Sequence, residues 1–67
     1  MATLDFVIEN MHCGSCVRSV MRAINALPGT HAEEVRLGSA RVRTEATPEQ
    51  IEQALRNAGY PAHVLLT

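Results

Sequence analysis

The chain has 67 residues, of which 46% are apolar, and six arginines, no lysine and seven acids give it a net charge of −1. A domain this short buries only about 60% of its unfolded surface, so we expect one domain over residues 1–67 and no multi-residue catalytic cleft. The charges form no basic patch for nucleic acid, and no apolar run approaches the roughly 18 residues of a membrane helix.

The first part of the chain predicts a strand followed by a helix. Leu4, Phe6 and Ile8 alternate with mostly polar residues, which is typical of a half-buried strand over residues 3–9. After turn-prone residues 10–14, apolar residues recur at helical spacing from Ser15 until Pro28 and Gly29 end the helix. The predicted buried stripe of this helix consists of Val17, Val20, Met21, Ile24 and Leu27.

Two more strands are predicted in the middle of the chain. Residues 30–37 have a polar first half, so we expect a weak or edge strand there, with Val35 and Leu37 pointing the same way. Gly38 and Ser39 predict a tight turn, and residues 40–44 alternate as a third strand would.

The last part of the chain predicts a capped helix and a closing strand. Thr47 is the expected N-cap, Pro48 occupies the first helical position, and Gln50 completes a capping box. Gly59 is the expected end of this helix, and residues 60–66 form the fourth strand. The predicted buried stripe consists of Ile51, Ala54, Leu55 and Ala58.

The order of these elements is β-α-β-β-α-β. Two βαβ halves with right-handed crossovers place both helices on one face of the sheet. We therefore predict an α+β, ferredoxin-like fold with a four-stranded antiparallel sheet.

The only cysteines, Cys13 and Cys16, lie where the first strand gives way to the first helix. A helix N-terminus favours anions and lowers the pKa of a thiol placed there. No signal peptide is visible, so we expect a cytoplasmic protein whose thiols stay reduced. The pair is then a candidate metal or redox site rather than a structural disulfide.

Two thiolates form a soft site of low coordination number, which selects Cu(I). Structural zinc usually takes four protein ligands, and a single cysteine pair excludes a zinc ribbon. An open site also lets thiolates of another protein add to the ion and remove it, which suits delivery better than storage.

These residues resemble the heavy-metal-associated domain family of small copper chaperones and N-terminal modules of copper-transporting P-type ATPases. The likeness covers essentially the whole chain and lies in Met11-x-Cys13-x-x-Cys16, in the residues that end the first helix, and in Gly59-Tyr60. It implies that Cys13 and Cys16 bind Cu(I), that Met11 packs beneath the loop without binding metal, and that Tyr60 lies beside the site, as in bacterial copper chaperones.

Three positions depart from the family pattern. Asn10 replaces a glycine, although asparagine tolerates the same backbone angles. His12 replaces a threonine or aspartate, and Glu33 replaces an apolar strand residue, which leaves the pairing of the second strand open. His12 is a possible third ligand, but adjacent loop side chains commonly diverge, so we favour a solvent-facing side chain.

The resemblance implies a copper chaperone, not an enzyme, that hands its ion to a copper-transporting P-type ATPase or a copper-responsive regulator. Arg18 and Arg22 are either solvated or a docking patch for an acidic partner. We expect a monomer that does not insert into a membrane. Whether a shared metal ion bridges two copies into a homodimer stays an open question.

Two alternatives also remain open. The first is a small thiol–disulfide oxidoreductase, because such an enzyme also places C-x-x-C at a helix start. The second is a metal-binding module that forms part of a heavy-metal ATPase for Zn(II), Cd(II) or Hg(II). Met1 and the short length favour a free-standing protein.

Overall fold

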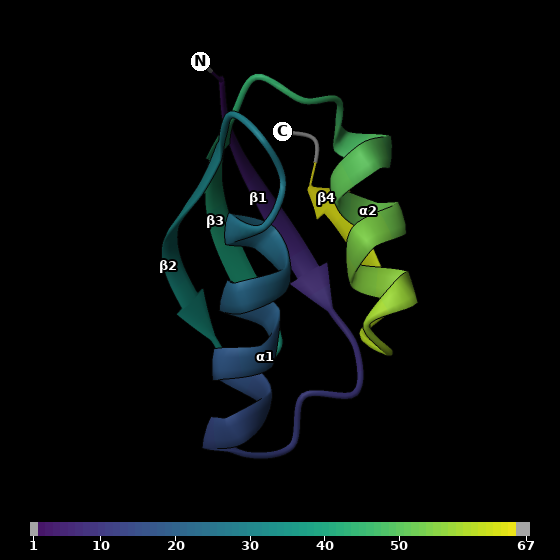
Figure 1. Ribbon diagram of the computed structural model, residues 1–67. Coiled ribbons are helices and arrows are strands. Elements are labelled where there is room, and N and C mark those ends of the chain that lie inside the picture. Colours follow the sequence, from purple (N-terminus) through teal and green to yellow (C-terminus); the bar gives the residue numbers. More distant parts are fainter. Residues whose placement is uncertain (1, 66–67) are drawn as a thin grey trace.

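The computed structural model describes residues 2–65, which form four strands and two helices in the predicted order (Figure 1). The elements are β1 (Ala2–Ile8), α1 (Gly14–Asn25), β2 (Thr30–Arg36), β3 (Ser39–Thr44), α2 (Pro48–Asn57) and β4 (Ala62–Leu65). Leu66, the last residue predicted for the fourth strand, lies outside the described residues. None of the helices within residues 2–65 has the length and apolar character needed to cross a membrane.

The sheet has the order β2-β3-β1-β4, and each pair of neighbouring strands is antiparallel. Both helices cover the same face (Figure 1), which confirms the predicted ferredoxin-like fold. Val7 pairs with Ser39, and Ile8 pairs with Ala62. The loop after β1, the turn between β2 and β3, and the loop before β4 therefore meet at one end of the sheet.

The core lies between the sheet and the two helices. Phe6, Val42, Ile24 and Leu55 are fully buried and come from four different elements. Burying such a side chain stabilises the fold by about 1.5–3 kcal/mol. The alternation predicted for the first strand is confirmed, because Phe6 and Ile8 are buried whereas Val7 is 41% exposed.

The predicted stripe of α1 is correct at its centre and wrong at one edge. Val20 and Ile24 are buried, but Met21, which we expected in the core, is 39% exposed. One residue advances a helix by about 100°, so position 21 lies on the flank of a stripe centred between residues 20 and 24. Leu27 follows the end of α1 and is half-buried.

The hairpin of β2 and β3 differs from the prediction by one residue. The turn lies at Leu37 and Gly38 rather than at Gly38 and Ser39, and Gly38 has a φ of 88°, which favours glycine. Leu37 is 58% exposed, so it does not share the face of the half-buried Val35. β2 is an edge strand, as predicted.

A bulge in β2 accommodates Glu33. The pairing with β3 shifts between Ala32 and Glu34, so one extra residue is inserted opposite the partner strand. Because of this insertion, Ala32 and Val35 both contribute to the core although they are three residues apart. The second strand therefore pairs normally on both sides of the acidic residue that departs from the family pattern.

Helix α2 begins as predicted. The Thr47 hydroxyl accepts a hydrogen bond from the Gln50 N–H at 3.3 Å, and the Gln50 side chain accepts one from the Thr47 N–H at 3.0 Å. Ile51 and Leu55 are buried. Ala58, which we expected in the buried stripe, is exposed because the helix ends at Asn57.

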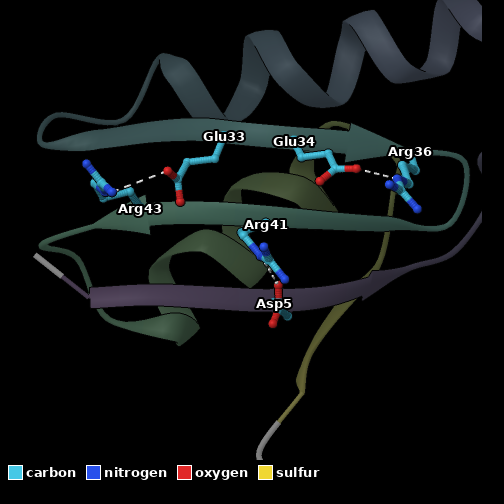
Figure 2. A network of polar contacts seen from close by, with 6 residues as sticks. All are labelled: Asp5, Glu33, Glu34, Arg36, Arg41 and Arg43. Carbon is cyan, nitrogen blue, oxygen red and sulfur yellow. Dashed lines mark hydrogen bonds and ion pairs between the residues drawn. The ribbon is translucent and has the colours of Figure 1, made fainter.

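Opposite charges alternate on the sheet face that the helices leave uncovered (Figure 2). Arg41 on β3 donates to Asp5 on β1 at 3.1 Å, and Arg43 lies 3.3 Å from Glu33. Arg36 pairs with Glu34 within β2. Arg36, Arg41 and Arg43 are thus each matched by a carboxylate.

Candidate metal centre

The two cysteines lie where the loop after β1 meets the start of α1. Asn10 turns the chain away from the sheet with a φ of 67°, and its side-chain amide donates to the Gly59 carbonyl at 3.4 Å. Asparagine therefore adopts the backbone angle for which the family uses glycine. Cys13 is the N-cap of α1 with extended backbone angles, and Cys16 lies in the first turn of the helix.

The Cys13 and Cys16 sulfur atoms are 3.9 Å apart, and both thiols are free. A disulfide would bring them to about 2.05 Å. A metal–thiolate bond is about 2.3 Å long, and twice that length exceeds the observed separation, so one ion can contact both sulfurs. Cys13 is exposed whereas Cys16 is half-buried, so the loop presents one sulfur more openly than the other.

The surroundings of Cys13 favour its thiolate form. Ser15 Oγ lies 2.9 Å from the Cys13 sulfur. This hydrogen bond, followed by those from the backbone N–H groups of Cys16 and Ser15, lowers the pKa of Cys13 to about 7. The Cys13 sulfur therefore reaches the charge state that binds metal near neutral pH.

Alkylation of Cys13 is expected to follow this pKa. In the reduced, metal-free protein the rate with iodoacetamide should rise about tenfold per pH unit below pH 7 and level off above it, because only the thiolate reacts. Peptide-resolved mass spectrometry gives the midpoint. In urea the midpoint should return to the ordinary value near 8.5; a folded protein with that same midpoint would contradict the prediction.

Met11 connects the cysteine loop to the neighbouring hairpin. Its sulfur accepts a hydrogen bond from the Gly38 N–H at 3.3 Å, and its half-buried side chain packs against the core. The thioether therefore contacts the turn between β2 and β3, and the role beneath the loop that the family resemblance implies for Met11 stays a prediction.

Tyr60 lies on the other side of the site, in the loop before β4. Its N–H donates to the Leu55 carbonyl at 2.8 Å, and the Glu9 N–H donates to the Pro61 carbonyl at 2.8 Å. These bonds hold the half-buried ring near the cysteine loop. The neighbouring Cys16 side chain is the main cause of a raised pKa of the Tyr60 hydroxyl, so this hydroxyl stays protonated at neutral pH.

His12 is exposed beside the cysteines. Within residues 2–65 no group of three or more His, Cys, Asp or Glu side chains is arranged to hold a metal ion. A role of His12 as a third ligand stays a hypothesis, and its solvent-facing orientation stays a prediction.

Replacing His12 with alanine is expected to weaken Cu(I) binding less than about tenfold, or 1.4 kcal/mol. The reason is that two thiolates already satisfy a soft ion. Competition with a Cu(I) chelator measures the change, and His63→Ala serves as a matched control because His63 is exposed and its ring contacts Glu9 at 2.9 Å. A larger loss confined to His12→Ala would identify this side chain as a ligand.

Arg18 and Arg22 are exposed on α1, one turn apart. Together with Met21, Asn25 and Ala26 they line a shallow surface depression. Sequence reasoning had placed Met21 in the core and so missed the apolar side chain between the two cations. Ser15 was also missed, although its place between the cysteines was the signal that could have found it.

The fold and the pair of free thiols together define a small domain with a candidate metal site. The sequence model of the heavy-metal-associated domain family matches residues 5–61, and the chain belongs to this family.

Three similar proteins illustrate the relationship. Copper-transporting ATPase 1 of Rhizobium meliloti is 39% identical over 97% of this chain, which spans only 8% of the ATPase. The N-terminal domain of PacS from Synechocystis PCC6803 is 34% identical with a TM-score of 0.88, covering 98% of this chain and 100% of that domain. An uncharacterized protein of Haemophilus influenzae is 29% identical over 92% of this chain and 97% of its own length.

Proposed function

We propose that this domain is a copper chaperone that carries one Cu(I) ion between Cys13 and Cys16. The observation that carries the proposal is the pair of free sulfurs 3.9 Å apart at the start of α1, of which Cys13 is exposed and Cys16 half-buried. Thiolates are soft ligands that favour Cu(I) over harder ions. The similarity to Copper-transporting ATPase 1 of Rhizobium meliloti supports the same cargo.

Delivery would proceed by exchange of thiolate ligands. A cysteine of the partner adds to the ion, and a sulfur of this chain then leaves it; copper stays in the same oxidation state, so no electron donor is needed. The exposure of Cys13 gives an incoming thiolate access. The partner proposed here is a copper-transporting P-type ATPase, with a copper-responsive regulator as the alternative.

One surface of the helix that begins at the cysteines would guide this partner. Arg18, Met21 and Arg22 are exposed on α1 and line the same surface depression. Two cations around an apolar side chain fit an acidic surface with an apolar centre, because complementary charges steer encounters and set the register of the complex. We place the exchange in the cytoplasm, where thiols stay reduced, and assign the chain no catalytic activity.

Anaerobic titration of the reduced protein with Cu(I) tests the proposal. One ion held per chain, and retained against Zn(II), is the expected result. Tight Zn(II) binding with weak Cu(I) binding would instead support a zinc or cadmium carrier. Catalytic reduction of a disulfide substrate without tight Cu(I) binding would support the oxidoreductase.

A second candidate is that the chain works as one module of a longer heavy-metal ATPase. The chain is 39% identical to a segment that makes up 8% of the Rhizobium ATPase, which supports this role, and it matches 97% of the Haemophilus protein, so a relative also exists as a chain of about this length. Immunoblotting of source cells with an antibody against the domain separates the two by the length of the polypeptide.

A further inference from the structure

The hydroxyl of Ser15 is aimed at one sulfur of the cysteine pair. Ser15 Oγ lies 2.9 Å from Cys13 Sγ, within the first turn of α1. Ser19, one helical turn later, uses its hydroxyl differently, donating to the Ser15 carbonyl at 3.1 Å. Two serines on the same face of one helix therefore have different partners, and only the first contacts Cys13.

The direction of the Ser15 hydrogen bond follows from the charge of the sulfur. A sulfur that binds a metal ion is a thiolate and has no proton to donate. The hydroxyl of Ser15 must then be the donor, and Cys13 Sγ the acceptor. A hydrogen bond to a ligating sulfur draws electron density from it and tunes its bond with the metal.

The other sulfur has a different environment. Cys16 is half-buried inside the first turn of α1, whereas Cys13 is exposed at the N-cap. The Tyr60 side chain neighbours Cys16. The two ligands of a shared ion would therefore differ both in access and in the groups around them.

We infer that Ser15 is a positioning residue that holds the Cys13 side chain in one rotamer and makes Cys13 the more easily displaced of the two sulfurs. This inference rests on the proposed Cu(I) function. In the exchange step a partner thiolate forms a bond with Cu(I) and the bond from Cu(I) to Cys13 breaks. The released Cys13 thiolate keeps the hydrogen bond from Ser15, so no proton moves and copper remains Cu(I).

Three variants test this role. Ser15→Ala removes the donor, Ser15→Thr keeps a hydroxyl, and Ser19→Ala is the control because the Ser19 hydroxyl bonds to the Ser15 carbonyl and to the Tyr60 side chain rather than to a cysteine. Stopped-flow measurement of Cu(I) removal by bathocuproine disulfonate should show about fivefold slower release from Ser15→Ala, the order expected for one hydrogen bond. Ser15→Thr and Ser19→Ala should stay within about twofold of the original protein.

A second measurement needs no metal. Three-bond couplings in the reduced, metal-free protein report the Cys13 χ1 angle, and Ser15→Ala should change them from single-rotamer to averaged values. Unchanged couplings, or equal slowing in Ser19→Ala, would overturn the inference. If the original protein takes up no Cu(I), the proposed function fails, and with it the effect on release; the couplings then decide the positioning role alone.

Discussion

Replacing Cys13 or Cys16 with serine is expected to abolish tight Cu(I) binding. Each substitution leaves a single sulfur where two lie 3.9 Å apart, and a hydroxyl is a poor ligand for a soft ion. We expect affinity to fall at least about a thousandfold, or about 4 kcal/mol. Anaerobic titration in competition with a chelator measures the loss in each variant.

The control is the fold of the metal-free variants. Cys13 is exposed and Cys16 is only half-buried, and neither belongs to the buried core. Both variants should therefore keep the circular dichroism spectrum of the original protein and nearly its Tm. Full Cu(I) binding by either variant would remove that cysteine from the proposed site, and loss of folding would make the binding result a consequence of unfolding instead.

The sequence predicted most of the fold because its local signals agree with one another. Thr47, Pro48 and Gln50 specify the start of α2 through side-chain chemistry within four residues, and the structure contains both hydrogen bonds of that capping box. The alternation around Phe6 similarly specifies which face of β1 is buried. Such signals need no knowledge of distant parts of the chain.

The errors arose where tertiary packing decides. Helical spacing alone does not tell whether Met21, on the flank of the stripe, meets another element or solvent, and the structure leaves it 39% exposed. The bulge at Glu33 likewise depends on the pairing with β3. The bulge lets both Ala32 and Val35 face the core. The turn begins at Leu37, one residue earlier than predicted, so Leu37 is exposed and does not share the face of Val35.

For the candidate site, the sequence predicted which residues would bind a metal ion, and the structure showed how the surroundings of Cys13 and Cys16 differ. The C-x-x-C spacing predicted two thiolates near one ion from the residues alone. That Cys13 is exposed and hydrogen-bonded to Ser15, while Cys16 is half-buried, depends on side-chain rotamers at the start of α1. Spacing does not encode those rotamers.

An exposed exchange site requires a domain that folds without its ion, because the ion must leave without unfolding the protein. The buried core supplies this stability, and Leu55 is one of its largest fully buried side chains. Leu55→Ala is expected to lower the free energy of unfolding by about 2–5 kcal/mol. A domain of this size has only roughly 3–10 kcal/mol in total, so the variant should be close to unfolding at 37 °C.

Leu37→Ala is the matched control, since it removes the same atoms from a side chain that is 58% exposed. Its free energy of unfolding should stay within about 0.5 kcal/mol of the original protein. Urea denaturation of the reduced, metal-free proteins measures both, with equal m-values showing that the unfolded states are comparable. Equal losses in the two variants would contradict the assignment of the core. An original protein that unfolds when its metal is removed would show that the ion holds the fold together, which an exchangeable cargo must not do.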